Sequence, residues 1–193
     1  MRVIILGGFL GSGKTTALLQ MARYLVSRGG VVIIENEIGE VGVDDKFLRS
    51  GGLAVRNLFS GCACCTVSGD LTAAAREIRE KENPEFLVIE TTGVAYPLNM
   101  RENLAYALGV ESRIAILADA ARWNRLVGTL EGLIAGQLEG ADAVLINKCD
   151  LSDEETLAKI EADILGLEPN AKIFRVSALS GIPDSVWGAA TGV

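Results

Sequence analysis

The chain has 193 residues, 49% of them hydrophobic, and a net charge of −7. These values fit one α/β domain with a sizeable core and disfavour nucleic acid and anionic membranes as partners. The sequence contains no apolar run of 18 residues, so it predicts no transmembrane helix. A strand that begins at residue 2 leaves no room for a cleavable signal peptide, and we therefore expect a cytoplasmic protein.

A glycine-rich loop follows the first strand. The apolar run at residues 2–6 leads into Gly8-Phe9-Leu10-Gly11-Ser12-Gly13-Lys14-Thr15, and a helical pattern extends to about residue 27. This is the G-x-x-x-x-G-K-T phosphate-binding pattern in the strand, loop and helix context that it requires. The glycines let backbone N–H groups point at phosphate oxygens, while Lys14 adds positive charge and Thr15 offers a hydroxyl to Mg²⁺. The nucleotide-binding residues that we predict here are Gly8, Gly11, Ser12, Gly13, Lys14, Thr15 and Thr16.

An acidic segment follows the second buried strand, which we expect at residues 31–34. It extends from Glu35 to Asp45 and contains two glycines. The carboxyl end of a strand in a doubly wound sheet is where ligands bind, so we expect this segment to face the γ-phosphate. Its carboxylates, which include Glu37, Glu40 and Asp44, exceed what Mg²⁺ alone needs. Some would orient the attacking water or bind a second metal, and others would simply be solvated.

Three of the four cysteines are crowded into Cys62-Ala63-Cys64-Cys65. Crowded thiols in a reducing compartment suggest metal or redox chemistry rather than a disulfide. The chain has no histidine, so a metal site must use thiolate, carboxylate, backbone or water ligands. Thiolates suit Zn²⁺, Co²⁺, Ni²⁺ or Cu⁺, with a fourth ligand from Glu37, water or a second subunit. Redox sensing and apolar packing are the alternatives, and we interpret Cys149 as structural.

The rest of the chain alternates between strands and helices. We expect an ambiguous strand at residues 53–58, a helix at 71–82, a strand at 86–89, a helix at 97–108, a strand at 114–118, a helix at 121–138, a strand at 143–146, a helix from a capping box at Ser152 to about residue 165, a strand at 172–176, and a final turn or helix at 181–193. This order predicts a mainly parallel, doubly wound sheet with helices on both faces. No linker divides the chain, so residues 1–193 are expected to form a single P-loop NTPase domain of the α/β class.

Polar residues end several of these strands. Glu90 ends the strand that we expect beside the P-loop strand, where an acid positions a Mg²⁺-bound water; a solvated acid is the alternative. Asn147-Lys148-Cys149-Asp150 is an N-K-x-D pattern. An aspartate there can accept hydrogen bonds from both N1–H and the N2 amine of guanine, which adenine cannot offer. We therefore predict GTP rather than ATP.

The other residues of this pattern have expected roles as well. Asn147 would tie loops together and reach the purine, and Lys148 would lie along the face of the base. A backbone N–H at Ser177-Ala178 would meet the guanine carbonyl.

Taken in order, these motifs resemble the GTPase domain of the CobW-type metallochaperones, relatives of HypB and UreG. The resemblance rests on the segments Gly7–Thr16, Glu35–Glu40, Gly61–Cys65, Glu90–Gly93 with Pro97, and Gln137 through Asp150. It implies a GTPase whose nucleotide state is coupled to the binding of Zn²⁺, Co²⁺ or Ni²⁺ for a client metalloprotein or cofactor-insertion enzyme, and a GTP-dependent homodimer is one assembly that the resemblance suggests. By that resemblance Cys62, Cys64 and Cys65 bind the transition metal with Glu37 or Glu40 close by. The catalytic residues would be Lys14, Thr15, Glu37 and Glu90.

Two other functions remain alternatives at this point. One is a GTP-gated protein chaperone for a cofactor enzyme, such as a corrinoid enzyme, with structural or redox-active thiols. The other is a small-molecule kinase, which the N-K-x-D pattern disfavours. The sequence contains no evident arginine finger, although Arg49, Arg56 and Arg101 are candidates.

Overall fold

The computed structural model describes residues 1–35, 53–57 and 67–193. Within these residues the chain forms a seven-stranded sheet in the order β3-β2-β4-β1-β5-β6-β7, and every strand pair is parallel. The predictions for Glu37, Glu40, Cys62, Cys64 and Cys65 fall on residues outside this description. The expected α/β class, with a parallel sheet, is confirmed.

The described elements follow one another in the expected alternation. They are β1 (Arg2–Gly8), α1 (Lys14–Val26), β2 (Val31–Glu35), β3 (Leu53–Asn57), α3 (Val67–Lys81), β4 (Phe86–Glu90), α4 (Pro97–Leu108), β5 (Ser112–Asp119), the 3₁₀ helix η1 (Ala120–Arg122), α5 (Trp123–Leu138), β6 (Ala143–Asn147), the 3₁₀ helix η2 (Cys149–Leu151), α6 (Glu154–Leu167), β7 (Lys172–Arg175) and α7 (Asp184–Thr191).

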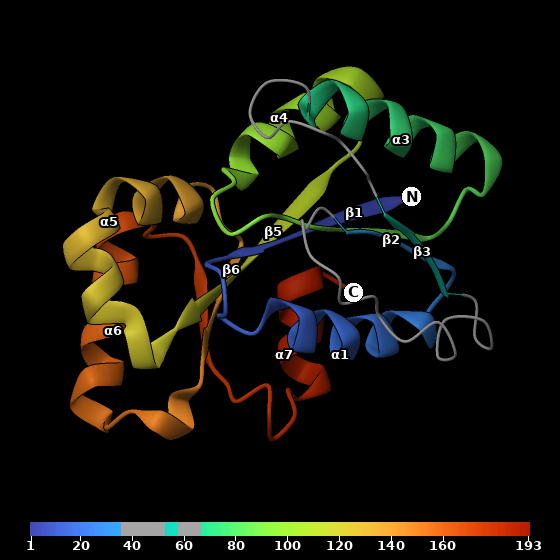
Figure 1. Ribbon diagram of the computed structural model, residues 1–193. Coiled ribbons are helices and arrows are strands. Elements are labelled where there is room, and N and C mark those ends of the chain that lie inside the picture. Colours follow the sequence, from blue (N-terminus) through green and yellow to red (C-terminus); the bar gives the residue numbers. More distant parts are fainter. Residues whose placement is uncertain (36–52, 58–66) are drawn as a thin grey trace.

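Helices cover both faces of the sheet (Figure 1). One face packs against α3, α4, α5 and α6, and the other packs against α1 and α7. Strand residues alternate between the two layers, as in β1, where Val3 and Ile5 enter the first core and Ile4 and Leu6 the second. Because both faces are buried, the central strands are continuous apolar runs, as parallel strands usually are. Trp187 on α7 is almost fully buried and belongs to the core.

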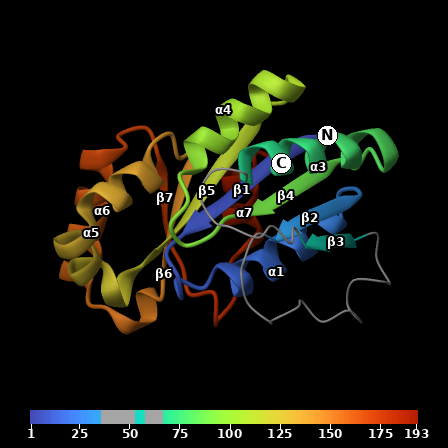
Figure 2. The same ribbon diagram turned by 45° about the horizontal axis from the view of Figure 1, so that its top comes forward.

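The strand register brings several strand ends to one edge of the sheet. Leu6 of β1 pairs with Glu90 of β4, and Asp119 of β5 pairs with Asn147 of β6. The chain also changes direction across the sheet at β1, since β4 lies on one side of it and β5 on the other, as Figure 2 shows. This is the topological switch point at which doubly wound folds bind their ligands.

Three predicted helix boundaries were wrong. The helix α3 begins at Val67 rather than at residue 71, so Ser68, Gly69 and Asp70 are helical. The capping residue of α6 is Asp153 rather than Ser152, because the Asp153 carboxylate accepts a 2.8 Å hydrogen bond from the Thr156 N–H. The helix predicted at 121–138 is divided into η1 and α5, and α5 has non-helical torsion angles at Leu130. Glycines on either side of Leu130 explain this break, since glycine lowers helix stability.

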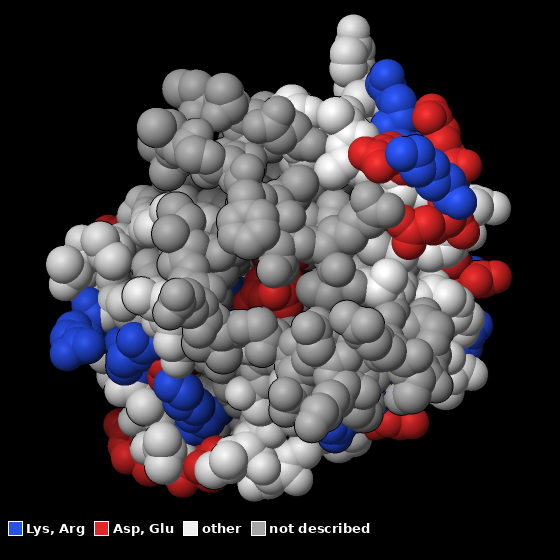
Figure 3. Space-filling model, turned by 45° about the vertical axis from the view of Figure 1, so that its right-hand side comes forward, with Lys and Arg blue, Asp and Glu red and all other residues white. Residues whose placement is uncertain are grey.

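Of the ambiguous segment at residues 53–58, Leu53–Asn57 form strand β3, which pairs in parallel with β2 at the edge of the sheet, and Leu58 lies outside the described residues. On the face in Figure 3, Lys and Arg side chains lie close to Asp and Glu side chains. Lys81 and Glu77 form an exposed ion pair of 3.0 Å on α3. In the described part of the chain, no helix has both the length and the apolar character needed to span a membrane.

An ion-pair network joins β7 to α6 and should make stability depend on pH. Arg175 donates to Glu161 and Glu154 at 2.6 Å each, and the hydrogen bond from Arg175 lowers the pKa of Glu161 below its usual 4.5. Since folding lowers the pKa of Glu161, the ionised side chain stabilises the folded state above pH 4.5. This contribution to the free energy of unfolding is lost as the pH falls through the folded pKa. We expect Glu161→Gln to lower the melting temperature slightly at pH 7 and by less at pH 3, measured by thermal unfolding.

The control is Glu102→Gln, because Glu102 lies exposed on α4. It should leave the melting temperature unchanged at both pH values. If wild type melted above Glu161→Gln by as much at pH 3 as at pH 7, the stabilisation would not come from the ionised Glu161 carboxylate.

Candidate nucleotide-binding site

The glycine-rich loop connects the end of β1 to the start of α1. Gly13 caps the helix with φ at 96°, a left-handed conformation that side chains rarely adopt. A Cβ atom at Gly13 would also collide with the Asn147 amide nitrogen. Glycine is therefore required at this position for both conformation and space, and the helix begins at Lys14 with its N–H end facing the loop.

Three consecutive carbonyl groups of this loop are held by side chains from the ends of β5 and β6. Leu10 O accepts from Arg122 at 2.6 Å, Gly11 O accepts from Lys148 at 2.8 Å, and Ser12 O accepts from Asn147 at 2.7 Å. In a planar trans peptide the carbonyl and the following N–H point in opposite directions. The N–H groups of Gly11 and Gly13 therefore point away from these side chains, which gives the loop an inner surface of donors suited to phosphate.

Lys14 and Thr15 lie where the phosphate-binding pattern predicts. Lys14 is buried, and its ammonium group donates to Phe9 O of the same loop at 3.2 Å. The Thr15 hydroxyl donates to the Glu90 carboxylate at 3.4 Å, and Glu90 is buried at the end of β4. A hydroxyl and a carboxylate side by side at the phosphate loop are oxygen donors of the kind that Mg²⁺ prefers. The two residues therefore fit the predicted Mg²⁺ site.

The Asn147 carboxamide connects the phosphate loop to the loop after β7. Its nitrogen donates to Ser12 O, and its oxygen accepts a 2.8 Å bond from the Ala178 N–H. Asn147 thus ties two loops together, as the sequence suggested. We expected a backbone N–H of the Ser177-Ala178 segment to meet a guanine carbonyl. The Ala178 N–H donates to Asn147 here, so a base would have to share that donor or use a neighbouring one.

The other two residues of the N-K-x-D pattern lie beside Asn147. Lys148 has φ at 63°, an uncommon left-handed conformation for a residue other than glycine. Its ammonium group bonds to Gly11 O rather than standing free. Asp150 lies exposed in η2 and makes no hydrogen bond or ion pair with another described residue. Its carboxylate is therefore available to a ligand.

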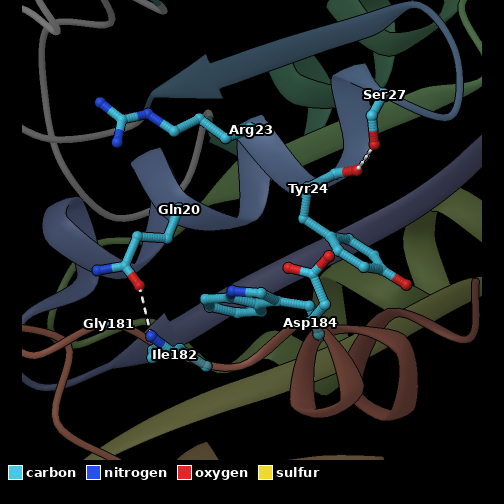
Figure 4. A pocket seen from close by; sticks show the side chains of 8 residues that line it. Gln20, Arg23, Tyr24, Ser27, Gly181, Ile182 and Asp184 are labelled. Atoms are coloured by element: carbon cyan, nitrogen blue, oxygen red, sulfur yellow. Dashed lines mark hydrogen bonds between the residues drawn. The ribbon is translucent and has the colours of Figure 1, made fainter.

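Sequence reasoning missed Gln20, which lies on α1. Its amide donates to Ala178 O at 2.6 Å and accepts from the Ile182 N–H at 2.7 Å, so one side chain holds both ends of the loop at residues 178–182. Figure 4 shows Gln20 turned toward Ile182 beside a shallow hollow of about 270 Å³ between α1 and the start of α7. No sequence pattern marks a glutamine six residues after the P-loop lysine as a contact to a distant loop.

Sequence reasoning also assigned no role to Asp119 and Arg122. The Asp119 side chain is fully buried, and one carboxylate oxygen accepts from both Arg122 and Lys148 at 2.7 Å each. The available signal was an acidic residue at the end of a buried strand next to the P-loop strand.

One candidate arginine finger was wrong. Arg101 donates to Gly140 O at 2.6 Å and to the Asp142 carboxylate at 2.7 Å. Both partners precede β6, so this arginine lies near the amino end of that strand, whereas the P-loop follows the carboxyl end of β1. Arg49 and the side chain of Arg56 lie outside the described residues. Among the residues that are described, no three His, Cys, Asp or Glu side chains come together as a metal site, and the predicted cysteine ligands are not among them.

Residues 2–175 match the model of the family described as CobW/HypB/UreG, nucleotide-binding domain. This chain belongs to that family. It is 34% identical to the zinc chaperone YjiA of Escherichia coli over 83% of this chain, and 30% identical to the zinc chaperone CobW of Pseudomonas aeruginosa over 91%. The matches cover 54% and 56% of those relatives, so this CobW-family chain spans about half the length of the curated relatives it matches.

Solved structures share the fold at lower identity. HypB from Archaeoglobus fulgidus superposes with a TM-score of 0.72 at 18% identity, covering 97% of this chain and 86% of its own. The Zn(II)-bound YjiA GTPase from E. coli gives 0.70 at 22% identity, covering 100% and 62%. These likenesses confirm the P-loop α/β fold of this CobW-family chain.

The Gln20 contacts predict a local effect on the loop at residues 178–182. Gln20→Leu removes one donor and one acceptor, leaves the Ile182 N–H without its partner, and should cost about 1–3 kcal/mol of unfolding free energy. Hydrogen exchange should show faster exchange of the Ile182 amide. The Val176 amide, which donates to Ile146 O in the sheet, is the internal control and should keep its protection. An Ile182 amide that stays protected in this variant would mean that another group holds the loop.

Proposed function

We propose that this chain is the nucleotide-binding part of a GTP-hydrolysing metallochaperone, which binds a transition metal in one nucleotide state and delivers it in the other. The observation that carries the proposal is the bond from Asn147 to Ser12 O, because it joins the guanine-specific pattern to the phosphate loop in one site. Membership of the CobW/HypB/UreG family supports it. Relatives named zinc chaperones and a zinc-regulated GTPase metalloprotein activator favour zinc as the cargo over cobalt or nickel.

The roles that we propose at the phosphate end follow from the contacts. Gly8, Gly11, Ser12, Gly13, Lys14, Thr15 and Thr16 bind the phosphates. Thr15 would hold Mg²⁺ directly and Glu90 would hold it through water, and a bound Mg²⁺ would supply positive charge for the phosphate oxygens. Glu37, from outside the described residues, is proposed to act in hydrolysis. At the base end, Asp150 reads guanine, while Asn147, Lys148, Ser177 and Ala178 shape its pocket.

The proposed cargo site uses Cys62, Cys64 and Cys65, with Glu37 or Glu40 nearby. These residues follow β2 and β3, the strands on the β4 side of the P-loop strand. GTP would order the segment after β2 and thereby complete the thiolate site. Hydrolysis would release that segment again. The proposed client is a metalloprotein or cofactor-insertion enzyme. The proposed assembly is a GTP-dependent homodimer, and the expected compartment is the cytoplasm. Thermodynamic linkage requires the metal to tighten GTP binding by the same factor.

Guanine recognition is tested by Asp150→Asn. A carboxylate accepts from the N1–H and the N2 amine of guanine, whereas an amide presents a donor that suits the 2-carbonyl of xanthine. We expect GDP affinity to fall by about 100-fold and XDP affinity to rise, measured by calorimetry. The fold should be unaffected because Asp150 is exposed and has no partner among the described residues. Unchanged GDP affinity would remove the basis for assigning GTP.

Metal coupling is tested by titrating the reduced protein with Zn²⁺, Co²⁺ and Ni²⁺ in the presence of a Mg²⁺-GTP analogue, of Mg²⁺-GDP, and of neither nucleotide. We expect one equivalent to bind at least about tenfold more tightly in the GTP-analogue state, a coupling of about 1.4 kcal/mol. Cys64→Ala should abolish this binding.

The matched control is Cys149→Ala, since Cys149 is half-buried in η2 and packs against the core. It should retain the metal stoichiometry. Metal binding that ignores the nucleotide, or that survives the loss of Cys64, would favour a GTP-gated protein chaperone with structural or redox-active thiols instead.

A further inference from the structure

A buried carboxylate, Asp119, lies beside the phosphate loop with two cations: Arg122, which belongs to neither sequence motif, and Lys148 of the N-K-x-D pattern. Asp119 is the last residue of β5, and its side chain has no exposed surface. Its Oδ2 accepts from Arg122 Nε and from Lys148 Nζ, both at 2.7 Å. A buried carboxylate is tolerated when it is paired in this way, and removing a single partner of such a group is costly.

Each of the two cations also binds a carbonyl group of the phosphate loop. Arg122 reaches Leu10 O at 2.6 Å and Lys148 reaches the next carbonyl, Gly11 O, at 2.8 Å. The guanidinium lies against Gly11, where its Nη2 and Nη1 would be 3.1 and 3.4 Å from a Cβ atom. The absence of a side chain at Gly11 therefore gives Arg122 access to the loop.

We infer that Arg122, oriented by Asp119, is a positioning residue that holds the phosphate loop in its nucleotide-binding conformation. Holding Leu10 O fixes the peptide plane that carries the Gly11 N–H and turns that donor toward the inside of the loop. The planar fork of arginine can bond to a carboxylate through Nε and to a carbonyl through Nη2 at the same time. The inference deepens the proposed function and rests on guanine nucleotide binding.

The chain contains a matched control for this arrangement. Arg101 also joins a carbonyl to a carboxylate, Gly140 O and Asp142, but both of these partners precede β6. Arg122→Met and Arg101→Met therefore remove similar contacts, and only the first removes a contact to the phosphate loop. Arg122→Lys keeps the positive charge without the fork and separates geometry from electrostatics.

The experiment measures the affinities of the four proteins for GDP, IDP and a GTP analogue, their melting temperatures, and single-turnover GTP hydrolysis at saturating nucleotide. We expect Arg122→Met to lower the affinities for GDP and for the GTP analogue alike, by about tenfold. Arg122→Lys should recover little of the lost affinity. Hydrolysis should stay within about threefold of wild type, because the loop is positioned for both ground state and transition state. The ratio of IDP to GDP affinity should not change, since Asp150 reads the amine that IDP lacks.

Arg101→Met should lower the melting temperature with nucleotide affinity intact. Wild-type affinity in Arg122→Met, or an equal loss of affinity in Arg101→Met, would overturn the positioning role and leave the proposed function standing. A fall in hydrolysis of about 100-fold with unchanged affinity would also overturn it, because the guanidinium would then act on the transferred phosphate. A wild-type protein that binds no guanine nucleotide would overturn both the inference and the proposed function.

Discussion

The orientation of one buried carboxamide governs the geometry of the nucleotide site. Asn147 has a donor side and an acceptor side, and each meets a backbone group of the opposite kind, on Ser12 and on Ala178. Rotating the amide by half a turn would place like groups together, so only one orientation satisfies both loops. Ser12 lies 135 positions from Asn147 in the sequence, and this single side chain sets the spacing between the phosphate loop and the loop after β7.

Much of the fold could be predicted because its signals are local. Apolar runs bounded by glycine or polar residues identified the central strands, and Pro97 marked the start of α4. The errors arose where two local signals competed. Both Ser152 and Asp153 are good capping residues, and only the hydrogen bond to Thr156 shows which one caps α6. The edge strand β3 was ambiguous because its alternation is weak in the sequence.

The site was predictable where a short motif carries the chemistry and unpredictable where contacts join distant elements. The P-loop and the N-K-x-D pattern lie where the sequence placed them. Gln20 carries no such signal, because its partners belong to a loop more than 150 positions away. Arg101 and Arg122 look alike in the sequence, yet Arg101 contacts residues that precede β6, whereas Arg122 follows the carboxyl end of β5 and contacts the phosphate loop. Which arginine approaches the phosphate-binding loop depends on topology rather than on residue type.

The last strand, β7, is the outermost strand on one side of the sheet. An edge strand presents unpaired backbone groups that could add a strand from another molecule. β7 has only four residues, and its first and last residues, Lys172 and Arg175, are basic. Short length and positive charge at an edge oppose such pairing. Lys172 is exposed at this edge, whereas Arg175 is paired with Glu154 and Glu161 of α6, so a neutral substitution at Lys172 would remove positive charge from the edge without breaking a contact to α6.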